Sequence, residues 1–193
     1  MKEQKKQLAT VRKYVERNME NLEYHNFNHV LDVEKTVVII VKEEKVANKE
    51  KFVLQTAAIL HDIKRSEKVS AEVAKKVLKN LGYNQTQINL VADLILATKR
   101  EKEPKNLLEK ILLDADLDNL GREDFFERNS ALRKEQGKLD VPDYEWHKKT
   151  YDFLKNHRYY TNTAQKLRGE GLKKNIERVE NYLRKLKEVE NAA

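Results

Sequence analysis

Glycine and proline are scarce in this sequence, and their scarcity is what most restricts the folds open to it. The chain of 193 residues contains five glycines and two prolines, so it has few of the residues that end helices and form tight turns. Apolar residues recur at helical spacing along almost the whole chain, as at Val30, Val33, Val37 and Val41. No alternating run bounded by turn residues predicts a strand. The chain is therefore predicted to be all-α.

The β-branched run TVVII at residues 36–40 is the segment whose local propensity most favours a strand. Its flanks continue a helical period, so a helix is predicted there as well. The expected helices, in chain order, are one around 8–15, one from about 30 to 47, then 52–61, 66–81 and 85–98, one after Pro104 that contains LLEKILLDADL, and finally 122–136, 144–155 and 162–190.

The length suits one sizeable core and is short for two. No low-complexity linker or break in composition marks a second domain, so a single domain over residues 1–193 is predicted. The last expected helix carries an apolar stripe that favours packing on the core over a coiled-coil partner, because the stripe is too short for several heptads. Its members are Ile176, Val179, Leu183, Leu186 and Val189.

Charged residues are numerous but mixed in sign. The net charge of +7 arises from 39 basic and 32 acidic side chains interleaved along the chain, a pattern typical of solvated helix faces. Without a basic block that contains aromatic residues, nucleic-acid binding is not expected. No leader or membrane-length apolar run is visible, so no membrane association is expected and the cytoplasm is the expected location. The absence of cysteine excludes disulfides and thiolate metal sites.

Histidines and aspartates gather at three places in the sequence. The segment YHNFNH opens a predicted helix, AAILHD closes another, and LLDADLDNLG surrounds a third helix end. The residues concerned are His25, His29, His61, Asp62, Asp114, Asp116 and Asp118.

A divalent metal requires imidazoles and carboxylates that converge from different elements. The adjacent His61 and Asp62 cannot both face one core, but at a helix C-terminus both can reach one ion. Asp116 lies within an apolar run, where an unpaired carboxylate is costly to bury and a cation removes that penalty. One such histidine alone is more often structural, and an Asp-rich turn is often a helix cap. Their occurrence together in a helical chain favours a metal site.

The order His29, His61-Asp62 and Asp116 resembles the H…HD…D pattern of the HD-domain metal-dependent phosphohydrolases. YHNFNHVLDV is similar to the YHNxxH motif shared by cyclic-nucleotide phosphodiesterases and a group of small HD phosphohydrolases. Four further segments are also similar to that small group: SEKVSAEVAKKVLKNLGY, LILATK, DADLDNLG and FLKNHRYYT. The resemblance therefore covers nearly the whole chain. It implies a single HD-domain helical bundle, with a metal-site core over about 20–121 and additional C-terminal helices over about 122–193.

The resemblance also implies roles for individual residues. His29, His61, Asp62 and Asp116 match the ligands of a divalent metal ion (Mn, Fe, Ni, Zn or Mg), with Asp62 bridging if two ions are bound. His25 matches the histidine that protonates the leaving oxygen, so His25 and Asp62 are the implied catalytic residues. The implied reaction is hydrolysis of a phosphate ester by water that the metal activates, with His25 as general acid.

Lys64, Arg65 and Lys99 are candidates for binding the substrate phosphate, although surface lysines and arginines are common throughout this chain. The small group usually has a histidine shortly after the LILATK segment. Arg100 or Glu101 occupies that place here, which favours one metal ion over two. Glu101 is an alternative oxygen ligand.

Several other polar residues are interpreted as structural or supporting. Asp114 is expected to orient the metal site without binding the ion itself. Asp118 and Asn119 are expected to serve the turn or a helix cap. The two remaining histidines, His147 and His157, have no role in the resemblance. Trp146 and His147 are expected to be packing or rim residues.

The leading hypothesis is an enzyme, a metal-dependent phosphohydrolase that acts on a small phosphorylated substrate, a nucleotide or related metabolite. Phosphomonoesters and phosphodiesters fit equally. The alternative is a non-catalytic HD scaffold that binds a nucleotide or a metal and signals through a partner. A purely structural helical protein is the third reading, and it leaves the buried His-Asp and DADL positions unexplained.

Overall fold

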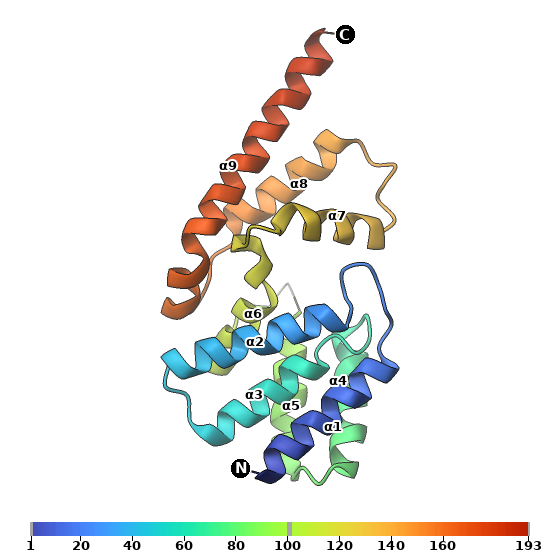
Figure 1. Cartoon of the computed structure of the whole chain (residues 1–193), viewed down its shortest axis with the longest axis vertical. Helices are drawn as coiled ribbons and strands as arrows, with labels where there is room; N and C mark the ends of the chain where they lie inside the picture. Colours follow the sequence, from blue (N-terminus) through green and yellow to red (C-terminus); the bar gives the residue numbers. More distant parts are fainter. Residues whose placement is uncertain (1, 100–101, 193) are drawn as a thin grey trace. The chain divides into compact units, whose positions relative to one another are not determined.

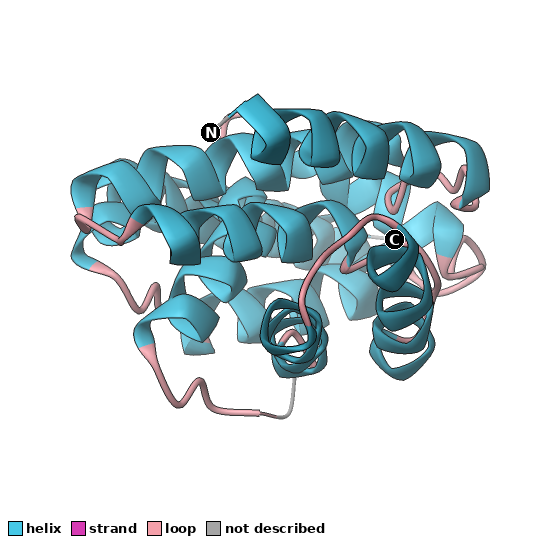
Figure 2. Ribbon diagram, turned by 90° about the horizontal axis from the view of Figure 1, so that it is seen from below, coloured by secondary structure: helices cyan, strands magenta, loops and turns pink. Residues whose placement is uncertain are grey.

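The computed structural model describes residues 2–99 and 102–192. Within these ranges all regular structure is helical and no strand occurs (Figures 1 and 2), so the predicted all-α class is confirmed. The helices are α1 (Lys2–Asn18), α2 (Phe27–Glu43), α3 (Asn48–Leu60), α4 (Glu67–Asn80), α5 (Gln85–Ala97), α6 (Leu107–Asp116), the short 3-10 helix η1 (Asp118–Gly121), α7 (Phe125–Glu135), α8 (Asp143–Asn156) and α9 (Asn162–Ala192).

The chain forms two compact units, Met1–Asp116 and Leu117–Ala193. The single domain expected from the sequence stays a prediction, and each unit is described by itself. Among the helices in the described ranges, none combines the length and the hydropathy that crossing a membrane requires.

Helix α3 is the centre of the first unit. It packs against α1, α2, α5 and α6, and its apolar sequence FVLQTAAIL is buried almost throughout. The run at residues 36–40 lies inside α2, where Thr36, Val37 and Ile40 are buried. Burial of these β-branched side chains on helical spacing outweighs their local preference for strands. Figure 1 shows α1, α2 and α3 as neighbouring helices of this unit.

The end of α2 differs from the sequence prediction. The helix ends at Glu43, several residues earlier than expected, and Lys45 takes a left-handed conformation with φ 55°. The amide of Val46 then donates to the carbonyl of Val41 at 3.0 Å, which is the hydrogen bond of a Schellman motif. Glycine normally occupies this position because a side chain strains it. The sequence therefore carried no signal for this helix end, whereas Gly82 correctly marked the end of α4.

In the second unit, η1 packs tightly against α9. Asp118 in η1 accepts two hydrogen bonds from Arg168 of α9, at 2.6 and 3.0 Å. The side-chain amide of Asn175 donates to both carbonyl groups that flank Gly121 in the chain, at 2.9 and 2.8 Å. A Cβ atom on Gly171 would overlap the carbonyl oxygen of Gly121. Glycine is therefore required for this close approach.

Replacing Gly171 with alanine should lower the free energy of unfolding by about 2–4 kcal/mol, because the new methyl group must push η1 away from α9. Gly169 in the same helix is the matched control, since a Cβ atom there meets nothing within 4 Å. Gly169→Ala should stabilise the helix by up to about 1 kcal/mol. Urea unfolding of the two variants measures both changes. Equal effects of the two substitutions would contradict the close packing.

The apolar stripe of α9 is buried only in part. Val179 and Leu183 are buried, as the expected core packing requires, but Val189 is 69% exposed. The expectation is wrong for Val189, which lies near the C-terminal end of this 31-residue helix.

His157, directly after α8, should make stability depend on pH. Burial lowers its pKa to about 4, and its Nε2 has no hydrogen-bond partner in the described part of the chain. An unfolded histidine titrates at about 6.5. Between these values only the unfolded chain takes up the proton, so stability is lost as the pH falls from about 6.5 to about 4. We expect a loss of roughly 1–3 kcal/mol.

Unfolding in urea at about pH 7 and about pH 5 tests this dependence. His157→Phe keeps a ring against Tyr159, whose centroid lies 4.7 Å from that of His157, but it cannot take up a proton. The variant should lose less stability than the native chain over this interval. An unchanged difference between the two pH values would show that other groups cause the pH dependence.

Candidate metal centre

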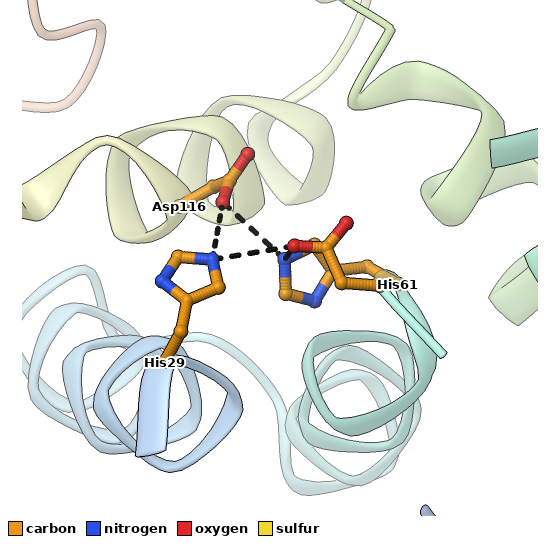
Figure 3. A group of neighbouring side chains, drawn as sticks. His29, His61 and Asp116 are labelled. Carbon is orange, nitrogen blue, oxygen red and sulfur yellow. Dashed lines mark hydrogen bonds and ion pairs between the residues drawn. The ribbon is translucent and has the colours of Figure 1, made fainter. Parts of the chain in front are cut away.

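Three helices bring His29, His61, Asp62 and Asp116 together. His29 lies in the first turn of α2, His61 and Asp62 directly follow α3, and Asp116 is the last residue of α6. One nitrogen or oxygen atom from each of the four lies within 4.8 Å of the corresponding atoms of the others. Figure 3 shows the side chains of His29, His61 and Asp116 pointing toward one another from their separate helices.

The turn before α2 is built by two residues of the YHN motif. The side chain of Asn26 accepts a hydrogen bond from the amide of His29 at 3.2 Å and so caps the helix. Its amide group also donates to the carbonyls of Leu22 and Glu23. Tyr24 is buried, and its ring centroid lies 5.1 Å from that of His29. No role for Asn26 is predicted from the sequence, although an asparagine directly before the first residues of a helix is a typical cap signal.

The imidazole of His61 is fixed in one tautomer. Its Nδ1 lies 2.8 Å from the carbonyl oxygen of Ala58. A carbonyl can only accept, so Nδ1 donates, and in the neutral ring the lone pair lies on Nε2, the atom beside Asp62 and Asp116. The turn after Asp62 is held by the buried Ser70, whose hydroxyl accepts from the amide of Lys64 at 3.1 Å and donates to its carbonyl at 3.0 Å. The sequence had suggested no such role for Ser70.

The spacing of the four side chains suits a metal ion. Nε2 of His61 lies 3.1 Å from Asp62 Oδ2 and 3.3 Å from Asp116 Oδ1. Nε2 of His29 lies 3.3 and 3.2 Å from the same two oxygens. Two ligand atoms that are each about 2.1 Å from one ion, at right angles, lie about 3.0 Å apart. The two nitrogens and two oxygens also match the donors that first-row divalent ions accept, so the residues fit the ion.

Electrostatics hold the cluster together. Burial alone lowers the pKa of His29 and His61, but hydrogen bonds and charge from Asp62 and Asp116 raise both above the ordinary value. Burial alone raises the pKa of Asp62 and Asp116, but the two histidines hold both well below the usual range. Each imidazole therefore stabilises negative charge on the carboxylates. Because a metal binds neutral imidazole, it must displace any protons held there.

His25 lies at the edge of the cluster. Its Nε2 is 3.9 Å from Asp62 Oδ2, and its side chain is 36% exposed. Its ring centroid lies 4.8 Å from that of Tyr24 and 5.8 Å from that of His29. His25 is thus next to the four residues but more open to solvent than the two histidines among them. This position suits a group that exchanges protons with a substrate.

The three candidate phosphate-binding residues lie at exposed or half-buried positions. Nζ of Lys64 donates to the carbonyl of Asn18 at 3.2 Å. Arg65 forms an exposed ion pair with Glu20 at 3.2 Å, and Lys99 is exposed after the end of α5. Their role in substrate binding stays a prediction.

The remaining residues singled out in the sequence lie as follows. Arg100 and Glu101, which bear on a second metal, lie outside the described residues. Asp114 is buried in α6, two residues before Asp116, and is not one of the four. Asp118 opens η1 and binds Arg168, which agrees with a structural role in this turn.

Family and structural comparisons are consistent with this geometry. The family model described as "HD domain" matches residues 26–119, a segment that contains all four clustered side chains. This segment, about half of the chain, is similar to HD domains. The resemblance to HD-domain proteins identified from the sequence is thereby confirmed. HD domains are generally metal-dependent phosphohydrolases.

Relatives of this chain include an uncharacterized protein of Clostridium beijerinckii, 36% identical over 95 residues. The match covers 44% of this chain and 59% of the relative, so the chain spans little more than half the length of that protein. Two solved structures are similar in fold: Bacillus subtilis YpgQ in complex with ADP (TM-score 0.70, 20% identity) and YpgQ alone (TM-score 0.69, 19% identity). Each match covers 96% of both chains.

Proposed function

We propose that this chain hydrolyses a small phosphate ester, with one divalent metal ion held by His29, His61, Asp62 and Asp116. The observation that carries the proposal is the convergence of these four side chains from α2, α3 and α6 within 4.8 Å. Burying two histidines and half-burying two carboxylates beside an apolar core costs free energy. A bound cation would offset that cost.

A bound divalent ion would supply a water of lowered pKa and would neutralise charge on the phosphoryl oxygens. The chain's own residues do the rest. Hydrogen bonding to Ala58 keeps His61 Nε2 available as a ligand. The cap at Asn26 fixes His29 in the first turn of α2 and the turn that carries His25. His25 would donate a proton to the leaving oxygen, and its partly exposed position beside Asp62 supports this role.

We infer further that the substrate is a nucleotide. The support is the fold shared with B. subtilis YpgQ, which has been solved in complex with ADP. A net charge of +7 also favours the approach of anionic phosphates. Monoester and diester hydrolysis are both compatible with a metal and a neighbouring general acid.

A substrate screen tests the proposal. The purified full chain, stripped of metal and reloaded with Mn, Ni, Mg, Fe or Zn, is incubated with nucleoside mono-, di- and triphosphates and with cyclic nucleotides. Release of phosphate, pyrophosphate or nucleoside monophosphate that requires the metal supports the proposed reaction. Binding of nucleotide and metal without turnover would instead support a non-catalytic signalling module. If the chain retains none of these metals, the proposal is overturned.

A further inference from the structure

A cavity outside the metal centre lies in the unit Leu117–Ala193. Its volume is about 300 Å³, at the lower end of the range for small-molecule pockets. Four ring-bearing side chains line it: Phe126 from α7, Trp146 and His147 from α8, and Tyr182 from α9. The centroid of the His147 ring lies 6.5 Å from that of Phe126 and 4.7 Å from that of Tyr182. Such walls favour a planar ligand.

A buried amide also lines this cavity. Asn129 is 8% exposed, and its Oδ1 lies 3.4 Å from the hydroxyl of Thr150. That hydroxyl has a single hydrogen and makes a shorter bond, 3.0 Å, to the carbonyl of Trp146. Within the described residues the Asn129 amide thus has only one long contact. A primary amide presents a donor and an acceptor side by side, and a buried amide is more stable when both are paired. A ligand with an adjacent donor and acceptor would satisfy it.

A second polar atom is available on His147. Its Nδ1 lies 2.8 Å from the carbonyl oxygen of Asp143, so Nδ1 is the donor and the neutral ring keeps a lone pair on Nε2. The cavity wall therefore combines aromatic rings with an amide and an acceptor nitrogen.

The charged groups nearby are already engaged. Arg133 donates to Asp143 and to two main-chain carbonyls, and its guanidinium carbon lies 5.8 Å from the ring centroid of Trp146. The guanidinium carbon of Arg178 lies 4.5 Å from the ring centroid of Phe126. Two arginines beside these rings disfavour a cationic ligand. Because three of the N–H groups of Arg133 already donate to protein acceptors, a phosphate is not the expected ligand either. An uncharged ring fits best.

We propose that this cavity binds an uncharged purine, as base or nucleoside, at a site separate from the metal centre. Aromatic walls stack on any base. An asparagine amide pairs with the adjacent N6 donor and N7 acceptor of adenine, and His147 Nε2 can accept from a further N–H group. This second site does not depend on the proposed hydrolysis, since its ligand carries no phosphate.

The position of Trp146 makes the proposal measurable. It is the single tryptophan of the chain, so its fluorescence, excited at the red edge where adenosine does not absorb, reports on this cavity. The full chain, stripped of metal, is titrated with adenosine, and equilibrium dialysis with labelled adenosine counts the bound ligand. We expect a saturable change in emission and one adenosine bound per chain.

Two variants locate the ligand. Asn129→Leu keeps the side-chain volume but removes the amide, and it should weaken adenosine binding about 10-fold or more. His147→Phe keeps a ring and removes the lone pair, which gives an independent test if Asn129→Leu does not fold by circular dichroism. Asn156→Leu, an exposed position at the end of α8, is the matched control and should bind as the native chain does.

Three results would overturn the proposal. The first is the absence of bound adenosine in dialysis at millimolar concentration. The second is unchanged affinity in both folded variants. The third is loss of binding in His61→Ala, which would place the purine at the metal centre and not in this cavity.

Discussion

Replacing Asp116 with asparagine should remove stable metal binding and, with it, any phosphohydrolase activity. Asp116 Oδ1 lies 3.2 Å from Nε2 of His29 and 3.3 Å from Nε2 of His61. An amide in its place removes the negative charge that faces both imidazoles. Loss of a residue that merely orients a ligand weakens metal binding about 10–100-fold, so loss of a ligand itself should weaken binding by at least about 100-fold. Turnover should fall by a similar factor.

Metal content after reloading with Mn, measured together with binding calorimetry, is the direct readout. A second readout does not require a substrate. Metal that binds only the folded chain stabilises it by about 2.7 kcal/mol when present at 100 times its Kd. Added Mn should therefore raise the Tm of the native chain and leave that of Asp116→Asn unchanged. Asp93→Asn, at an exposed position in α5, is the matched control and should behave as the native chain does. Equal metal content in Asp116→Asn and the native chain would overturn the metal assignment.

The same measurement should depend on pH. The pKa values of His29 and His61 are raised by their carboxylate partners after burial has lowered them. Protons therefore compete with the metal at higher pH than at ordinary histidines, and metal affinity should weaken as the pH falls toward and below about 6.5.

The helices could be predicted because their signals are local. Apolar residues at helical spacing placed each helix near its observed position, and the helical period in the flanks of residues 36–40 correctly outweighed a β-branched run. Gly82 marked the end of α4 through a requirement of its own backbone, with φ 76°. The end of α2, just before Lys45, could not be predicted from such a local signal. Lys45 adopts the same kind of left-handed turn without glycine, and local sequence does not reveal that.

The candidate metal residues could also be found in the sequence, because each lies at a helix end beside apolar segments. Their supporting residues could not. Ser70 holds the turn after Asp62 from the next helix, and Gly171 matters only because η1 approaches α9 there. Both contacts depend on how elements pack, which side-chain spacing along the chain does not encode. The residues that would bind the substrate could not be identified from the sequence either. Lys64 and Arg65 are two among 39 basic residues, and only their surroundings show that each contacts other parts of the protein.

Replacing His25 with alanine should lower turnover by about 10²–10⁴-fold while metal content stays unchanged, if His25 is the general acid. Its position separates it from the metal ligands. His25 Nε2 is 3.9 Å from Asp62 Oδ2, farther than the 3.1–3.3 Å separations among the four clustered residues. It lies in the turn that Asn26 ties to the start of α2, so truncating its side chain leaves the helix cap and His29 in place.

The choice of leaving group makes this test specific for proton donation. An aliphatic alcohol leaves its phosphate ester as an unstable alkoxide and therefore needs a proton. A nitrophenolate is stable enough to leave without one. His25→Ala should therefore lose most of its activity toward the alkyl ester and much less toward the nitrophenyl ester, with equal metal content in both assays. A residue that only shapes the site would affect both substrates alike, and a ligand would take the metal with it. An equal loss on the two esters, or a loss of metal, would exclude His25 as the general acid, because only proton transfer to the leaving oxygen depends on the basicity of that oxygen.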